Sequence, residues 1–150
     1  AEIGEGGVRF KNKDTGEVVN LTPERSIQIQ NLLGADIIMA FDECTPYPAT
    51  EKLASNGVRR TLSWAERCLR AHERADVQAL FGIVQGSTYL HLREACAQSL
   101  IAMDLPGYAI GGVSVNWAAG RGAGGQGIHD EIQASIEQGR AQVQRRVCAL

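Results

Sequence analysis

The sequence predicts an α/β fold in which parallel strands alternate with helices. Three short apolar runs each end at once on a polar residue or a glycine pair: residues 35–41 before Asp42, 79–84 before Gln85, and 108–110 before Gly111-Gly112. Helical patterns lie between the runs, and a repeated βα unit requires parallel strands. The carboxyl ends of such strands face one mouth, where ligands bind. We therefore expect a small-molecule site built from a carboxylate, a carboxamide and backbone amides.

The bulk composition is that of a soluble globular protein. The 150 residues are 44% hydrophobic and 21% charged, with a formal net charge of -2, so nucleic-acid contact must be local. No apolar run approaches the roughly 18–20 residues that span a bilayer, and residues 1–7 lack the regions of a signal peptide. The four cysteines lie far apart, without a CxxC or Cys/His cluster. We expect a cytoplasmic protein without a zinc site or a disulfide scaffold.

The first expected elements are a hairpin and a helix. The hairpin covers residues 8–21, with its turn at Asp14-Thr15-Gly16. The helix begins with Thr22 as N-cap and Pro23 at its first position, and Gly34 is placed to end it. Its apolar surface is supplied by Ile27, Ile29, Leu32 and Leu33.

The first parallel strand and a long basic helix come next. Residues 36–41 are nearly all apolar, which predicts a strand covered on both faces. After a proline-braced loop at 43–48, a helix is expected from about residue 58 to 74, with four inward candidates: Leu62, Ala65, Leu69 and Ala71. It carries five arginines: Arg59, Arg60, Arg67, Arg70 and Arg74. We interpret them as a solvated face partnered by Glu66 and Glu73, with phosphate contact as the alternative.

The second and third strands complete the regular part of the chain. The strand that ends at Gln85 leads into a helix, which Leu105-Pro106-Gly107 ends, and the third strand begins at Tyr108. From Asn116 the pattern breaks. Residues 116–150 read as a glycine-rich linker and an amphipathic helical tail. Within the linker, Gly122, Gly124 and Gly127 match the dinucleotide fingerprint only in form, because no strand precedes them.

Five strings in fixed order carry a resemblance to a known family. They are LTPERSIQIQ at 21–30, DIIMAFDECTPYP at 36–48, WAERC at 64–68, LFGIVQG at 80–86 and GYAIGG at 107–112. Over about residues 8–115 the chain resembles the tRNA-guanine transglycosylases, or queuine tRNA-ribosyltransferases. Val115 after Gly-Gly-Val-Ser is more similar to the bacterial type.

The resemblance implies a fold and an activity. The family fold is a (β/α)8 TIM barrel, of which residues 1–115 would be a central part with about three recognisable βα units. The activity is exchange of the wobble guanine in tRNA for a 7-deazaguanine precursor of queuosine, through a covalent enzyme–ribose intermediate. The base to be exchanged must leave the stack of the anticodon loop, where unpaired bases are the least costly to extract.

The resemblance also implies which residues hold the base. Asp42 would accept hydrogen bonds from the edge of the base, and Gln85 and Gly112, with Gly111 beside it, would line the pocket. Guanine presents two adjacent donors beside a carbonyl oxygen, and a carboxylate accepts both donors at once. From the residues alone, Asp42 reads equally as a cap or turn residue, Gln85 as a structural amide and the glycine pair as a turn.

Several family features have no match in these 150 residues. They are the acid/base aspartate, the nucleophilic aspartate and the zinc-binding CxCxxC with its histidine. We therefore expect no catalytic residue, metal or cofactor here, and no base exchange by the chain alone. The expected partners are a guanine or 7-deazaguanine base, tRNA in the complete enzyme, and a homo- or hetero-oligomeric subunit, with no membrane.

Two alternatives stay open. One is an inactive paralogue that binds a base or partners a complete subunit. The other is an unrelated α/β enzyme with a phosphate site at Gly111-Gly112.

Overall fold

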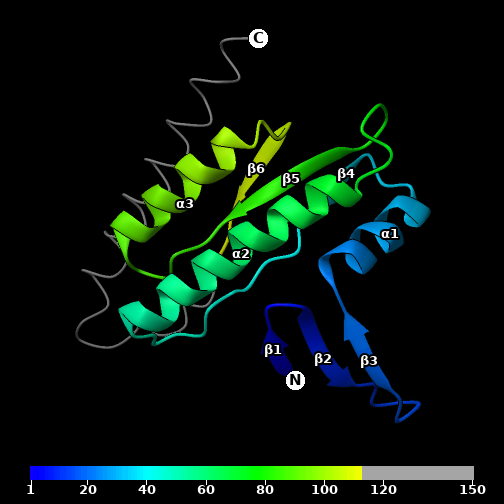
Figure 1. Ribbon diagram of the computed structural model, residues 1–150, viewed down its shortest axis with the longest axis horizontal. Coiled ribbons are helices and arrows are strands. Elements are labelled where there is room, and N and C mark those ends of the chain that lie inside the picture. The colour runs from blue at the N-terminus through cyan, green and yellow to red at the C-terminus, as the bar shows by residue number, and fades with distance from the viewer. Residues whose placement is uncertain (113–150) are drawn as a thin grey trace, which may run out of the picture.

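The parallel sheet predicted from the sequence is present. The computed structural model describes residues 1–112, and its parallel sheet has the strand order β4 (Ile37–Met39), β5 (Ala79–Val84) and β6 (Gly107–Ile110) (Figure 1). Ile37 pairs with Ala79, and Phe81 with Gly107. The expected linker and helix at 116–150 lie outside the described residues. None of the helices in residues 1–112 is long and apolar enough to cross a membrane.

A separate antiparallel sheet precedes it in the chain. The predicted hairpin is confirmed as β2 (Gly7–Lys11) paired with β3 (Val18–Leu21). A further strand, β1 (Glu2–Gly4), pairs with β2 in antiparallel register. Strand β1 was not predicted from the sequence, because three residues that end on a glycine carry no alternation to detect.

Helix α1 (Pro23–Leu33) begins and ends as predicted. Thr22 Oγ1 accepts a hydrogen bond from Arg25 N at 3.2 Å, and Gly34 ends the helix in the left-handed conformation, with φ 73°. Of the four residues that supply the apolar surface of α1, only Ile27 is buried. At 3.6 residues per turn, three other apolar side chains point away from the Ile27 face. These exposed residues are Ile29, Leu32 (84% exposed) and Leu33 (77% exposed).

The prediction that the first strand is covered on both faces is wrong within residues 1–112. Ile38 is buried, but its neighbour Ile37 is 55% exposed. Along β5, Leu80, Gly82 and Val84 are buried, while the residues between them are only partly buried. Within residues 1–112 the helices therefore cover one face of the parallel sheet, and the core lies between that face and the helices.

Helix α2 (Glu51–Ala71) starts earlier than expected. Thr50 is its N-cap, with Oγ1 accepting from Leu53 N at 3.3 Å. The helix continues through Gly57, where an added Cβ would lie 2.4 Å from Thr45 Oγ1. A larger residue would not fit here, which explains why the helix contains a glycine in spite of its low helix propensity. Of the four predicted inward residues, Ala65 is buried, Leu62 and Ala71 are partly buried, and Leu69 is exposed.

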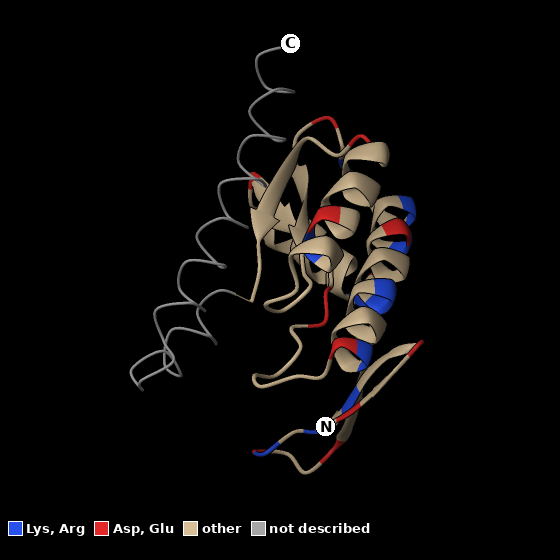
Figure 2. Cartoon of the chain, turned by 90° about the vertical axis from the view of Figure 1, so that its left-hand side faces the viewer, with Lys and Arg blue, Asp and Glu red and all other residues tan. Residues whose placement is uncertain are grey.

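The arginines of the basic face have partners inside the chain. Arg70 pairs with Glu66 at 3.8 Å, as predicted. Arg59 pairs with Glu5 at 2.8 Å, and Arg60 and Arg67 also pair with glutamates from distant segments. Acidic and basic residues lie next to each other along the helices (Figure 2). Helix α3 (Leu90–Ala102) then leads to β6, which begins one residue before the predicted Tyr108.

Candidate functional site

The carboxyl ends of the parallel strands bring the predicted site residues together. Gln85 follows β5 directly and donates from Nε2 to Asp42 Oδ2 at 2.6 Å. Gly111 follows β6, and its N–H donates to Val84 O at 2.9 Å, which extends the pairing of β5 and β6 to the site. The predicted carboxylate, carboxamide and glycine pair therefore share one mouth of the sheet.

The two glycines leave room for the Gln85 carboxamide. A Cβ added at Gly111 would lie 2.4 Å from Gln85 Nε2 and 2.7 Å from Ile83 Cγ2. At Gly112 the backbone has φ 75°, and an added Cβ would lie 3.0 Å from Gln85 Oε1. Side chains at these positions would push the carboxamide away from the backbone, so glycine is needed for this close approach.

The environment of Asp42 is partly desolvated. Burial raises the pKa of the Asp42 carboxyl above its ordinary value, and the hydrogen bond from Gln85 lowers it in part. A carboxylate accepts about four hydrogen bonds, so the bond from Gln85 leaves capacity for further donors. Where water competes less, each such bond is stronger. Asp42 is thus suited to accept a pair of N–H donors from a ligand.

The backbone on both sides of Asp42 is attached to helix α2. Phe41 N donates to Cys68 Sγ at 3.3 Å. The Phe41 ring stacks on the Trp64 ring, with centroids 4.9 Å apart. Glu43 N donates to Thr61 Oγ1 at 3.0 Å. The Glu43 carboxylate is also paired with Arg60, which reaches Glu5 Oε1 at 3.3 Å. Helix α2 therefore fixes the loop that carries Asp42.

The site also contains a buried arginine that was not predicted from the sequence. Arg93, in the first turn of α3, is 4% exposed. Its Nη2 donates to Gly111 O at 2.9 Å, and its Nη1 to Ser87 O at 3.2 Å. These partners are backbone carbonyls from two different loops, so no residue spacing in the sequence indicates them. Cys96 was missed for a similar reason: its Sγ accepts from Gln85 N at 3.4 Å.

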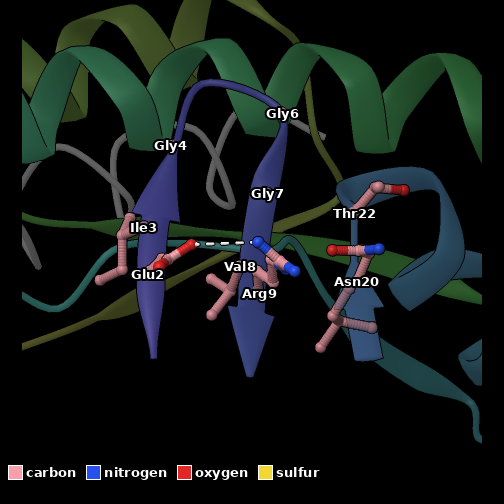
Figure 3. Close-up of a pocket in the computed structure, with 10 residues that line it drawn as sticks. Glu2, Ile3, Gly4, Gly6, Gly7, Val8, Arg9, Asn20 and Thr22 are labelled. Atoms are coloured by element: carbon pink, nitrogen blue, oxygen red, sulfur yellow. Dashed lines mark ion pairs between the residues drawn. The ribbon is translucent and has the colours of Figure 1, made fainter. Parts of the chain in front are cut away.

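A hollow lies on the antiparallel sheet, away from these residues (Figure 3). Across it, Arg9 Nη1 and Glu2 Oε2 form an ion pair 3.7 Å long between exposed side chains. Its lining residues all come from the first 22 positions of the chain, so none of the predicted site residues contributes to it. Among residues 1–112, no group of three or more His, Cys, Asp or Glu is arranged to hold a metal ion.

Comparison with known proteins identifies the family. A family model described as queuine tRNA-ribosyltransferase matches residues 1–120, and so includes β1. The queuine tRNA-ribosyltransferase of Synechococcus elongatus is 55% identical over 134 residues, which cover 89% of this chain and 33% of that protein. The protein of that name from a Nostoc species is 60% identical over 114 residues, 76% of this chain and 30% of the relative.

A third relative of the same name, from Geobacillus kaustophilus, is 56% identical over 113 residues, 75% of this chain and 30% of that protein. The chain therefore spans about a third of the length of the curated relatives it matches. These relatives are bacterial, as the resemblance implied. Both the extent of the family match and the level of identity lead to one conclusion: the chain belongs to the queuine tRNA-ribosyltransferase family.

Proposed function

We propose that this chain is the base-recognition part of a tRNA-guanine transglycosylase. The complete enzyme exchanges the wobble guanine of tRNA for a 7-deazaguanine queuosine precursor through a covalent enzyme–ribose intermediate. The observation that carries the proposal is the 2.6 Å hydrogen bond between Gln85 Nε2 and Asp42 Oδ2, at the carboxyl ends of two parallel strands. Membership of the family supports it.

Asp42 and Gln85 together complement the edge of guanine. The Asp42 carboxylate accepts from the ring N–H and the exocyclic amine, which are adjacent donors. Gln85 Nε2 has two N–H groups and gives one to Asp42, so the other serves the carbonyl oxygen of the base. The N–H of Gly112 is a further donor to that carbonyl. The site therefore offers acceptors and donors in the order in which guanine needs them.

The same arrangement rejects adenine. Adenine presents an unprotonated ring nitrogen where guanine has its N–H, so two acceptors would face each other at Asp42. A site built to hydrogen-bond one pattern discriminates strongly against a ligand that leaves its polar groups unpaired. We expect binding of guanine and of 7-deazaguanines with the same edge, and none of adenine.

We place the sheet in a (β/α)8 barrel, and the covalent chemistry outside these residues. Within residues 1–112, β4 and β6 each have one unpaired edge, as strands cut from a closed barrel would. The covalent step requires a nucleophile that attacks the ribose, and we assign that role to no carboxylate of this chain. Residues 1–150 then bind the base without exchanging it.

Calorimetric titration of guanine into the purified chain tests base recognition. Asp42→Ala removes the acceptor of both donors, and we expect it to lower affinity at least about tenfold. The matched control is Asp36→Ala, because Asp36 is exposed and lies immediately before β4. Guanine binding that survives in Asp42→Ala, or a folded chain that binds no guanine, would contradict the proposal.

A second assay tests the assignment of catalysis. The purified chain is incubated with tRNA and labelled guanine, and incorporation of label is measured. We expect none, and incorporation would place a nucleophile within these 150 residues. If the chain binds guanine and also co-purifies with a full-length member of the family, the partner-subunit alternative is favoured.

A further inference from the structure

Arg93 is buried where a cation is unfavourable. Its side chain is 4% exposed, and burial lowers the pKa of its guanidinium. No carboxylate in residues 1–112 forms an ion pair with it. It also lies in the first turn of α3, where the helix dipole opposes positive charge. These costs indicate that Arg93 does something other than stabilise the fold.

The guanidinium joins the ends of two strands. Nη1 donates to Ser87 O in the loop after β5, and Nη2 donates to Gly111 O after β6. Because the guanidinium is planar and its donors have fixed directions, it fixes the positions of these two carbonyl oxygens relative to each other. Gly111 O is the acceptor in the shorter bond, 2.9 Å long.

This contact determines where the next N–H points. In a trans peptide the C=O of one residue and the N–H of the next point in opposite directions. Since the Gly111 C=O faces Arg93, the Gly112 N–H faces away from it. Within residues 1–112 that N–H has no hydrogen-bond acceptor. We assign this donor to the ligand.

The glycine pair makes such an anchor necessary. Glycine adopts positive and negative φ with similar ease, and Gly112 lies at φ 75°. The Gly111–Gly112 peptide therefore has little intrinsic preference between its two orientations. Resting on the proposed function, we propose that Arg93 is a positioning residue that orients the Gly112 N–H toward the carbonyl oxygen of the bound base.

The test compares guanine with 6-thioguanine in calorimetric titrations. The two bases share the donors that Asp42 accepts, but the sulfur of 6-thioguanine is a weak acceptor. We expect the wild-type chain to prefer guanine. Arg93→Met keeps the length of the side chain and removes its donors, and we expect guanine affinity to fall about three- to tenfold, with little change for 6-thioguanine. The matched control is Arg74→Met, because Arg74 also donates to a backbone carbonyl, Asn31 O at 3.0 Å, but precedes β5.

The outcomes separate this proposal from the proposed function. If the wild-type chain binds neither base, base recognition itself fails. If it binds both and Arg93→Met weakens them equally, recognition stands and the positioning role is wrong. Asp42→Asn is expected to lower the affinity for both bases by the same factor. It therefore shows the result expected when a contact common to guanine and 6-thioguanine is lost.

A spectroscopic measurement with Arg93→Lys covers the case in which Arg93→Met does not fold. Lysine keeps the charge but cannot bridge two carbonyls in a fixed plane. In the 15N-glycine-labelled wild-type chain, we expect guanine to shift the Gly112 amide resonance more than 6-thioguanine does. In Arg93→Lys that difference is expected to disappear. Retention of the full difference would overturn the proposal.

Discussion

Gln85 and Asp42 are joined by a hydrogen bond of 2.6 Å although 43 positions separate them in the sequence. The bond connects the residues that follow β5 and β4. Burial raises the pKa of Asp42, and the Gln85 amide opposes that effect. The site thus keeps a carboxylate in a place that favours its neutral form, which is a common cost of binding sites.

Asp42→Asn is expected to stabilise the folded chain at neutral pH. Because the pKa of Asp42 is raised above its ordinary 3.8, the folded state binds the proton more tightly than the unfolded state. The stability this contributes is fully present below pH 3.8 and is lost as pH rises through the higher folded pKa. In urea unfolding at pH 7 we expect a gain of about 0.5–2 kcal/mol for the variant. At pH 3 the two chains should differ little. A less stable variant at pH 7 would mean that the hydrogen bond from Gln85 to the carboxylate outweighs the cost of burying its charge.

Gly111→Ala is expected to displace the Gln85 carboxamide. The new methyl group would lie 2.4 Å from Gln85 Nε2, so the amide must move and its bond to Asp42 is lost. We expect guanine affinity to fall about tenfold or more in calorimetry, while the circular dichroism spectrum stays the same. Gly4→Ala is the matched control, since an added Cβ there meets nothing within 4 Å. Equal affinities of the two variants would contradict the role given to Gly111.

Glu24→Gln is expected to lower the free energy of unfolding at neutral pH and to change it little at pH 2. Arg67 lowers the pKa of Glu24 from 4.5 to about 2, through bonds of 2.6 and 2.7 Å. The stability from this carboxylate is present above pH 4.5 and is lost as pH falls through about 2. Since the Glu24 side chain is 41% exposed, we expect a loss of only about 0.5–1 kcal/mol at pH 7.

The comparison for Glu24→Gln is Glu66→Gln, which breaks the longer, more exposed pair with Arg70. Urea unfolding of both variants at pH 7 and pH 2 provides the measurement. We expect Glu66→Gln to change the free energy of unfolding by less than Glu24→Gln at pH 7. A Glu24→Gln loss of the same size at both pH values would rule out the ion pair as its cause.

Trp64→Phe is expected to lower the free energy of unfolding by about 1–3 kcal/mol. Trp64 is fully buried, and its Nε1 donates to Glu5 O at 2.9 Å. Phenylalanine would leave a cavity and remove that bond, although Arg67 still donates to the same carbonyl at 3.0 Å. Denaturant titration followed by far-UV circular dichroism measures the change. A loss below about 0.5 kcal/mol would show that Trp64 does not tie the first sheet to α2.

Local chemistry was enough to predict much of the fold. Thr22 and Gly34 determine the ends of α1 through contacts within a few residues, and the alternation of runs predicted the parallel strands. The predictions failed where distant residues decide the outcome. Leu69 was expected to face inward but is exposed, and Glu5, the partner of Arg59, lies 54 positions away in sequence.

Some residues of the candidate site could be predicted from the sequence and others could not. Asp42 and Gln85 could be placed together because parallel strands present their carboxyl ends at one edge. Arg93 could not, because its two hydrogen bonds are to backbone carbonyls, which every residue has. When a side chain binds main-chain carbonyls, the residue types of its partners do not indicate the contact.

The attachment of the Asp42 loop to α2 has an entropic consequence. Because the N–H groups of Phe41 and Glu43 are both bonded to α2, this main chain loses its freedom when the protein folds, before any ligand arrives. Fixing the backbone of one residue costs roughly 1–2 kcal/mol of conformational entropy. In a preorganised site this cost belongs to folding and does not reduce the free energy of binding. A small planar base has few atoms with which to offset such ordering. Its affinity can therefore rest largely on one carboxylate.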